Sequence, residues 1–466
     1  MKIMGINHDT LISSSALIVD GEVVAAIPEE RLNRQKKYRN FPEKSFKYCL
    51  NANNLNIQDL DCITQSWNPG IHMEKFHPMA SGHRRYRHEI LYSIPDHILG
   101  IAGRPEVNYI EQNLVINNSK ISILYLDHHL CHAANAFYLS PHTEAAILTV
   151  DGRGEKITAG MYVGKNNRIE QLNEVLFPES LGSFYSTFTE YLGFKPENDE
   201  WKVMALSAMA PYNNEYTPIV RKSIKFIQET GGFELDLSLF KEHVYELPHY
   251  YTDKFIKLFG LPRQPSEPIT EKHYKIAAAM HCITEEILTK MLDNLYEKTK
   301  LDSVCCSGGI FMNSVFNGKV LRKTKFKNCF ISSCPDDSGL SIGGALYAYH
   351  DIFKKTKRYS QKHNYYGPEF NDEKIFEIIK KFNLEKLTSK PNNLSKTVAK
   401  LLRDQHLVGW FQGKMEFGQR ALGNRSILAD PRKNEMKDIL NRKIKHRESF
   451  RPFAPSILEE FVPEYF

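Results

Sequence analysis

The sequence predicts an α/β protein with a duplicated first domain and a smaller α/β domain after it. Strand-like apolar runs alternate with helical patterns along the chain, which is typical of mixed α/β folds. A unit of strand, acidic glycine-containing turn and strand at residues 3–27 recurs at 144–172. Such a recurrence indicates an internal duplication. A basic, polar stretch after residue 351 marks the start of a second unit.

The first repeated unit lies at the N-terminus. The opening KIMGINHD predicts a short strand, and residues 13–34, SSSALIVDGEVVAAIPEERLNR, predict a strand, an Asp-Gly turn, a strand and a helix. Two further apolar strands, KISILYLD and EAAILTVD, each end on an aspartate. The second continues through KITAGMYVGKNNRIEQL as another turn and strand, which produces the recurrence.

The elements after this repeat keep the α/β order. HYKIAAAMHCITEEILTKMLDNLYEKT predicts a long amphipathic helix, SVCCSGGIFMN a strand with a glycine turn, and CPDDSGLSIGGALYAYHDIF a turn leading into a helix. We therefore expect a first domain at residues 1–355, a linker at 356–365 and a second domain at 366–466.

The composition restricts the class of protein. With 466 residues, 42% of them hydrophobic and 25% charged, the chain is predicted to be globular, with two or three domains. No apolar run reaches the length of a membrane span and the start MKIMGINHDT lacks a signal-peptide core, so we expect a cytoplasmic protein without a membrane partner. The diffuse net charge of +6 suits an anionic small substrate and speaks against nucleic-acid binding.

The stretch LDHHLCHAANAF, residues 126–137, concentrates metal-binding residue types. His128 and His132 are four residues apart, so on a helix both imidazoles lie on one face and can share a metal. A zinc-protease HExxH motif requires glutamate where this chain has His129, which excludes that class. The alternative is a helix whose histidines face solvent or form hydrogen bonds in the core.

Two aspartates strengthen the metal interpretation. Asp151 in VDGRGE and Asp337 in PDDSG each follow a strand beside glycines. Ligands gather at strand ends in open α/β sheets. Two histidines and two carboxylates form a mixed nitrogen and oxygen site suited to Fe(II), Mn(II) or Zn(II).

Glycine turns offer candidate phosphate sites. DGRGE at 151–155 and SGGIFMN at 307–313 could present backbone N–H groups to phosphate oxygens. The chain has no Walker A motif and no GxGxxG after a strand, so P-loop and Rossmann readings have little support. Repeated strand–turn–strand units with acidic turns fit an actin-like (ASKHA, RNase H-like) nucleotide-binding core instead.

The chain resembles the nodulation-type and antibiotic-type O-carbamoyltransferases. The matching blocks run in that family's order: DHHLCHAANAFYLSP, TVDGRGE, SLGSFYSTFTEYLGF, KVMALSA, CCSGGIFMN, PDDSGLSIGGAL, GKMEFGQRALGNRSILADPR and KIKHRESFRPFAPSIL. The resemblance implies an actin-like transfer domain with a metal, typically iron and expected as Fe(II), and a threonylcarbamoyl-AMP-synthase-like domain that makes carbamoyl-adenylate from ATP and carbamoyl phosphate. Because that family continues for about another hundred residues after FVPEYF, we expect 366–466 to be the start of this second domain.

The resemblance also implies residue roles. His128, His132, Asp151 and Asp337 fall on the metal ligands. The nucleotide-contact regions include Gly152, Arg153, Gly154, Lys202, Ser307, Gly308, Gly309 and Asn313. Of these we take Lys202, together with His129 beside the metal pair, as a candidate catalytic residue; His129 is a candidate base for the acceptor hydroxyl.

The second unit contains a basic cluster between residues 414 and 451. Arginine binds phosphate through two parallel hydrogen bonds, and aromatic and proline residues in SFRPFAPSIL indicate a packed loop rather than a solvated surface. The residues expected to bind carbamoyl phosphate and ATP are Lys414, Arg420, Arg425, Lys443, Arg447 and Arg451.

Three functions remain open from the sequence. The first is ATP-dependent O-carbamoyl transfer from carbamoyl phosphate to a hydroxyl of a small secondary metabolite or sugar. The second is a tRNA threonylcarbamoyl-type transferase, which would need steeply salt-dependent tRNA binding. The third is a non-catalytic actin-like nucleotide-binding module. The chain could also form a homo-oligomer.

Overall fold

The computed structural model describes residues 1–68, 109–241 and 249–465. The chain divides into two compact units, Met1–Asn364 and Tyr365–Phe466. Residues 356–364, expected as linker, belong to the first unit. The Gln361 N–H donates to the Leu139 carbonyl at 2.8 Å, and the Arg358 guanidinium lies over the Phe137 ring at 4.4 Å. This segment therefore packs on the first unit.

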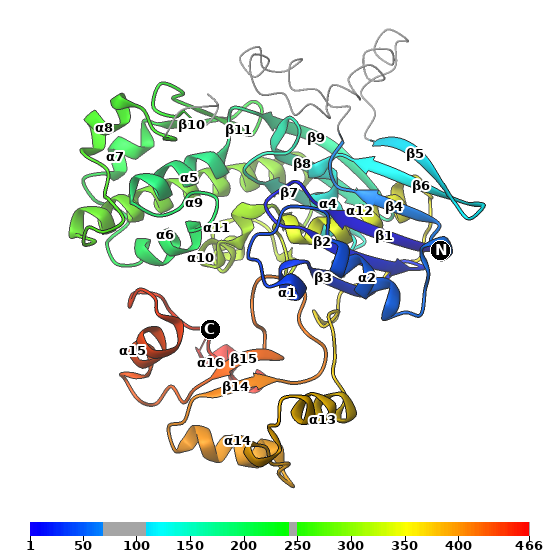
Figure 1. Ribbon diagram of the computed structural model, residues 1–466. Coiled ribbons are helices and arrows are strands. Elements are labelled where there is room, and N and C mark those ends of the chain that lie inside the picture. Colours follow the sequence, from blue (N-terminus) through cyan, green and yellow to red (C-terminus); the bar gives the residue numbers. More distant parts are fainter. Residues whose placement is uncertain (69–108, 242–248, 466) are drawn as a thin grey trace. The chain divides into compact units, whose positions relative to one another are not determined.

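The first sheet has six strands in the order β3-β2-β1-β4-β6-β5 (Figure 1). β1 is antiparallel to β2, β2 to β3, and β5 to β6, whereas β1–β4 and β4–β6 are parallel. The bounds are β1 Lys2–Asn7, β2 Ser14–Val19, β3 Glu22–Pro28, β4 Cys62–Gln65, β5 Tyr109–Ile116 and β6 Ser119–Leu126.

The second sheet repeats this arrangement in the order β13-β12-β7-β8-β9. β7, β8 and β9 form an antiparallel meander, and β12 and β13 join β7 in parallel, as β4 and β6 join β1. The bounds are β7 Glu144–Val150, β8 Ile157–Lys165, β9 Arg168–Leu176, β12 Ser303–Ser307 and β13 Asn328–Ile331. The order β3-β2-β1-β4-β6 in the first sheet corresponds to β9-β8-β7-β12-β13 in the second, which confirms the duplicated actin-like fold.

A pair of buried helices lies between the two sheets. α4, His128–Phe137, packs on β7, β8 and β12, while α12, Leu340–Tyr347, packs on β1, β2 and β4 and against α4. The contact is close, because a Cβ on Gly343 would lie 2.0 Å from the Cys131 carbonyl oxygen. The chain thus returns from the second repeat to cover the first sheet, which brings residues near 130 and 337 together.

The remaining helices of the first unit surround this core. α2, Glu43–Asn51, covers the first sheet with Phe46, Cys49 and Leu50. The long helix α9, Glu271–Thr299, packs against β7 and against α5, α6 and α7, which are Leu181–Tyr191, Glu200–Ser207 and Thr217–Arg221. The shorter elements are α1 Glu30–Asn33, β10 Ile224–Ile227, β11 Gly232–Leu235, α8 Asp253–Phe259, α10 Ser314–Asn317 and α11 Val320–Lys323.

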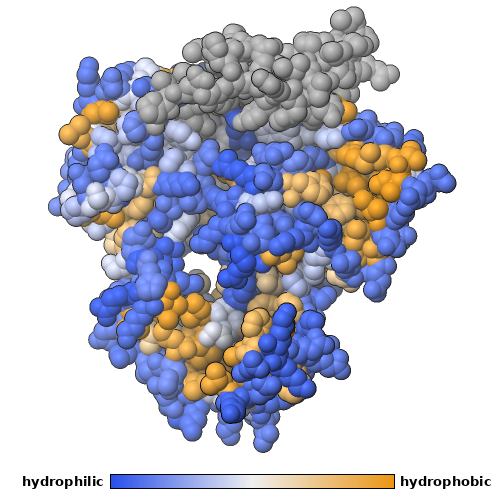
Figure 2. Space-filling view, in the orientation of Figure 1, coloured by the Kyte–Doolittle hydropathy of each residue, from blue (hydrophilic) through white to orange (hydrophobic). Residues whose placement is uncertain are grey.

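The second unit is built from short elements. β14 and β15 form an antiparallel pair on which α14 packs. Helices α13 and α14 bury none of their residues, and Figure 2 shows apolar side chains gathered on the surface of this unit. The bounds are α13 Asp372–Lys381, α14 Leu394–Arg403, β14 Val408–Phe411, β15 Arg425–Leu428, α15 Met436–Ile439 and α16 Val462–Tyr465. Across the described ranges, no helix combines the length and apolar character that a membrane span requires.

Candidate metal centre

Helix α4 begins at the end of β6 and places two histidines on one face. The Asp127 carboxylate caps the helix by accepting the Leu130 N–H at 2.8 Å, which satisfies one of the free donors of the first turn. The rings of His128 and His132, one turn apart, have centroids separated by 4.8 Å. Both side chains are buried, so the helix carries them into the core between the sheets.

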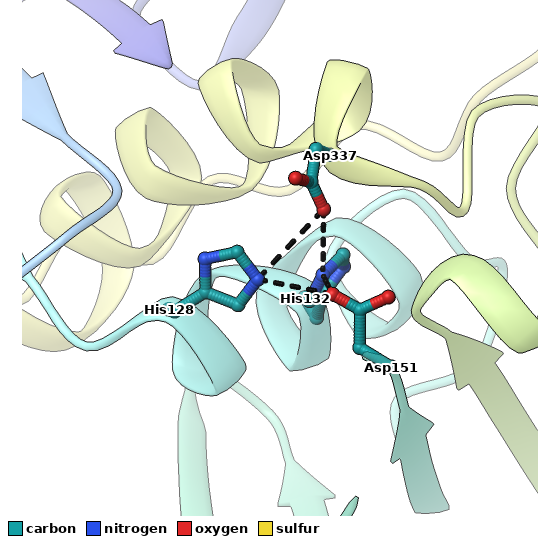
Figure 3. A group of neighbouring side chains, drawn as sticks. All are labelled: His128, His132, Asp151 and Asp337. Carbon is teal, nitrogen blue, oxygen red and sulfur yellow. Dashed lines mark hydrogen bonds and ion pairs between the residues drawn. The ribbon is translucent and has the colours of Figure 1, made fainter. Parts of the chain in front are cut away.

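Two carboxylates from the second repeat meet these imidazoles (Figure 3). Asp151 follows β7, and Asp337 begins the turn that leads into α12. His128 Nε2 lies 3.3 Å from Asp151 Oδ2 and 3.8 Å from Asp337 Oδ1, and His132 Nε2 lies 3.5 and 3.7 Å from the same two oxygens. One donor atom from each residue falls within 4.8 Å of the others, so the structure brings all four expected ligands together.

Backbone N–H groups fix the second oxygen of each carboxylate. The Gly309 N–H donates to Asp151 Oδ1 at 2.8 Å, and the Leu11 N–H donates to Asp337 Oδ2 at 3.0 Å. Each aspartate therefore keeps one oxygen for the histidines. Leu11 belongs to the turn between β1 and β2, so both repeats contribute to the orientation of the cluster.

The electrostatics favour a charged Asp151 carboxylate. Burial works to raise the pKa of Asp151, but the hydrogen bonds and charges of His128 and His132 outweigh it and hold this pKa well below its usual range. Burial likewise works to lower the pKa of His128, but Asp151 and Asp337 outweigh it and raise the pKa to about 9. A metal cation bound here would take the place of the proton on His128, because an imidazole ligates a metal in its neutral form.

The donor set fits a divalent transition metal. Ligand bonds of about 2.1 Å place neighbouring donors of a four-coordinate ion about 3.4 Å apart, close to the 3.3 to 3.8 Å between these histidine nitrogens and carboxylate oxygens. His132 Nε2 is buried and faces the Asp151 and Asp337 carboxylates at 3.5 and 3.7 Å. Its Nδ1 lies 3.3 Å from the Ser307 hydroxyl, a contact that would orient the ring toward an ion.

Glu155 supports the N-terminus of α4, a role that the sequence motifs did not predict. Its buried carboxylate accepts the Asn68 N–H at 2.6 Å and the His128 N–H at 3.2 Å, and so covers the N-terminus of α4 beside Asp127. Burial and the Asp127 carboxylate raise the pKa of Glu155 to about 8. Its position at the end of the VDGRGE motif could have suggested a role, but the motif does not show which residue it contacts, because His128 lies 27 residues away in the sequence.

The two candidate catalytic residues have defined surroundings. His129 is fully buried, with Nδ1 2.8 Å from the Thr149 hydroxyl, on the side of α4 that faces β7. Burial and the neighbouring histidines hold the pKa of His129 well below its usual value. Lys202 lies in the first turn of α6. Its Nζ is 3.2 Å from the Asp199 carboxylate and 5.7 Å from the centre of the Trp201 ring.

The glycine turns lie against the cluster. A Cβ on Gly308, whose φ is +100°, would lie 2.2 Å from the Val150 carbonyl oxygen, and one on Gly309 would lie 2.6 Å from Asp151 Oδ1. Glycine is required at these positions by the approach of β7. At Gly152 a Cβ would meet nothing within 4 Å among the described residues, so this turn has space beside it. The guanidinium of the next residue, Arg153, lies over the Phe177 ring at 5.4 Å. A Cβ on Gly154 would lie 2.9 Å from His129 Cδ2.

The basic residues of the second unit are partly gathered. Arg425, at the start of β15, donates to the Arg420 carbonyl at 3.2 Å. Arg447 donates to Asn441 Oδ1 at 2.6 Å and lies over the Phe453 ring. Burial lowers the pKa of Arg447, and the Arg420 charge contributes to this shift. Arg451 pairs with Glu448 at 3.4 Å. Lys414 lies in the loop after β14, and Lys443 lies in the π-helical segment Leu440–Lys445 that continues α15.

Comparison with known proteins decides the family. Residues 2–346 match the carbamoyltransferase N-terminus and residues 399–466 match the carbamoyltransferase C-terminus. The chain belongs to the carbamoyltransferase family. This confirms the resemblance predicted from the motifs.

Several carbamoyltransferase relatives match almost the whole chain. An uncharacterized protein of Synechocystis sp. is 36% identical, over 100% of this chain and 77% of its own length. The nodulation protein NolNO of Sinorhizobium fredii is 32% identical, over 98% of this chain and 64% of its own length. This carbamoyltransferase chain therefore spans about two thirds of NolNO.

Solved structures match about three quarters of the chain at low identity. The activator of the 2-hydroxyisocaproyl-CoA dehydratase from Clostridium difficile, with bound ADPNP, is 15% identical with a TM-score of 0.36, over 78% of this chain and 100% of that one. HypF of T. kodakarensis is 10% identical with a TM-score of 0.38, over 77% and 48% of the two chains. The fold assignment of this carbamoyltransferase rests on the strand order of its two sheets.

Proposed function

We propose that this carbamoyltransferase transfers a carbamoyl group from carbamoyl phosphate, by way of a carbamoyl-adenylate made with ATP, to a hydroxyl of a small secondary metabolite or sugar. The observation that carries the proposal is the buried group of His128, His132, Asp151 and Asp337 between the two repeats. Membership of the carbamoyltransferase family supports carbamoyl as the group that is transferred. The identities of the co-substrates and of the acceptor belong to the proposal.

The four residues of this cluster would hold the metal. A bound divalent ion would supply Lewis-acid polarisation of an oxygen of the carbamoyl group or of the acceptor. Asp151 and Asp337 balance the positive charge, and the Gly309 and Leu11 N–H groups keep these carboxylates in place. The burial of the four side chains excludes water, which protects a reactive acyl group from hydrolysis.

The turn after β7 is the proposed site of the nucleotide phosphate. The space beside Gly152 allows a ligand to approach the backbone. The Ser180 hydroxyl, which caps α5, donates to the Gly152 carbonyl at 2.6 Å and so connects the turn to the N-terminus of α5. A helix N-terminus favours an anion next to it.

A direct assay tests the proposal. The protein is incubated with ATP, carbamoyl phosphate and a panel of hydroxylated metabolites, and products are searched by mass spectrometry for a gain of about 43 daltons, the carbamoyl group. A carbamoylated product that requires both co-substrates is the expected result. Nucleotide binding without transfer to any acceptor would instead favour a non-catalytic module, and transfer that requires tRNA would favour the tRNA-modifying alternative.

A further inference from the structure

Both ends of the Asn313 amide form hydrogen bonds within the protein. This residue ends the glycine loop after β12 and caps α10, where Asn313 Oδ1 accepts the Phe316 N–H at 3.1 Å. Since a backbone N–H can only donate, the oxygen must face Phe316 and the amide nitrogen must face the other way. Asn313 Nδ2 then lies 2.9 Å from His281 Nε2. One N–H of the amide and one lone pair of its oxygen are thus used within the protein.

This orientation determines the tautomer of His281. Asn313 Nδ2 donates, so His281 Nε2 must accept and the proton lies on Nδ1. His281 Nδ1 lies 2.9 Å from the Tyr212 hydroxyl, which in turn donates to Glu285 Oε1 at 3.3 Å. His281 is completely buried, and burial lowers its pKa, which agrees with a neutral ring. Each group from Asn313 through His281 and Tyr212 therefore donates a hydrogen bond to the next, and Glu285 accepts the last one.

The far end of this chain of hydrogen bonds is a buried charge. Glu285 is 1% exposed and receives Lys319 Nζ at 2.6 Å and Lys323 Nζ at 2.9 Å. Burial works to raise the pKa of Glu285, but the hydrogen bonds from these two lysines outweigh it and lower the pKa. Lys319 and Lys323 belong to the segment that follows α10. The network thus ends on the segment that follows α10, a few residues beyond the glycine loop.

We infer that His281, on α9, is a positioning residue that fixes the side chain of Asn313 and thereby the shape of the 308–313 glycine loop. The Gly309 N–H of this loop donates to Asp151 of the metal cluster. The contact between His281 and Asn313 therefore also helps to set the position of the loop beside the candidate metal centre. The inference deepens the proposed function and rests on it for the role of the loop in nucleotide binding.

Hydrogen exchange without any ligand tests the positioning step. His281→Leu removes the acceptor, and we expect amide exchange in residues 309–317 to quicken about tenfold, the usual effect of leaving a buried donor unpaired. His281→Gln keeps an acceptor at the Nε2 position and should stay near wild type. Thr284→Val is the matched control, because Thr284 is buried on the same helix and bonds to Met280 within α9. Equal exchange in His281→Leu and Thr284→Val would overturn the inference.

A second variant covers the case in which His281→Leu does not fold. Asn313→Ser keeps a hydroxyl that can cap the Phe316 N–H but is too short to reach His281 Nε2, so we expect the same local increase in exchange. An unchanged loop in Asn313→Ser would overturn the inference.

Nucleotide binding separates this inference from the proposed function. We expect His281→Leu to raise the Kd for AMP-PNP, measured by calorimetry, about tenfold while metal content stays that of wild type. If wild type binds no AMP-PNP but the loop still responds to His281→Leu, the nucleotide step of the proposed function is wrong and the positioning role stands. If wild type binds AMP-PNP and His281→Leu binds it equally well, the role in nucleotide binding is wrong.

Discussion

The histidines of α4 differ in role because of the direction in which each leaves the helix. His128 and His132 meet two carboxylates, whereas His129 faces Thr149 at 2.8 Å on the β7 side. Neighbouring positions on a helix point about 100° apart, and positions four apart share a face. Metal binding should therefore depend on His128 and His132 and on the two aspartates.

Removal of His132 should abolish metal binding. His132→Ala leaves three donors and a buried space in place of the fourth, and we expect less than about a tenth of the wild-type metal content, since loss of a direct ligand exceeds the 10–100-fold effect of supporting residues. Elemental analysis measures the content. His350→Gln, which changes another buried histidine outside the cluster, should retain the metal. Full occupancy in His132→Ala would show that the ligand set is different.

At the scale of single elements, the glycine loop after β12 depends on residue type. Gly308→Ala places a methyl group 2.2 Å from the Val150 carbonyl oxygen at a φ of +100°, so we expect the free energy of unfolding to fall by at least about 2 kcal/mol. Gly318→Ala is the control, because its nearest neighbour would be 3.6 Å away and its φ is −68°. Urea denaturation of both variants decides; equal stability would show that the loop can move without cost.

The basic cluster of the second unit gives a prediction about substrate use. Arg425→Ala and Arg451→Ala should weaken carbamoyl-phosphate use by about 2 to 5 kcal/mol, the effect of losing a charged hydrogen bond to phosphate, and should leave nucleotide binding by the first unit nearly intact. KM for carbamoyl phosphate and Kd for AMP-PNP are the measurements. Arg432→Ala is the control, because this guanidinium is exposed and pairs with Asp430. Equal loss of nucleotide binding in both variants would indicate misfolding or a shared site.

Helices α13 and α14 should be the less protected elements of the chain. Neither buries a residue, and large apolar side chains such as Phe376, Phe382 and Leu401 are exposed, whereas α9 buries more than half of its length. Stability of a helix in a protein comes mostly from packing of its apolar face. Hydrogen exchange should be faster across residues 372–403 than across 276–295. Strong protection of 372–403 would show that another surface covers these helices in solution.

For the molecule as a whole, the sequence predicted what local patterns encode. Alternating apolar residues located β1, β2, β3, β7 and β8, and their recurrence predicted the duplication. The i, i+4 spacing of His128 and His132 predicted half of the cluster. Contacts made by backbone N–H groups left no such pattern, because Leu11 meets Asp337 across 326 residues and Gly309 meets Asp151 across 158. The pairing of His281 with Asn313 was likewise set by tertiary packing.

The buried neutral histidines should make the whole protein sensitive to mild acid. Burial lowers the pKa of His350 to about 4, below the unfolded value of about 6.5. Between these two values the unfolded state binds more protons, so the stabilisation is complete above pH 6.5 and is lost as the pH falls toward 4. For His350 alone we expect a loss of about 2 kcal/mol by pH 5.

Thermal unfolding between pH 7 and pH 5 measures this effect as the difference between wild type and His350→Gln, in which other titrating groups cancel. The Tm of wild type should fall more steeply with acid than that of His350→Gln. His249→Gln, a change at an exposed histidine, should follow wild type. Parallel curves for wild type and His350→Gln would mean that His350 takes up its proton inside the fold, which the burial of its ring and the neighbouring Arg358 charge argue against.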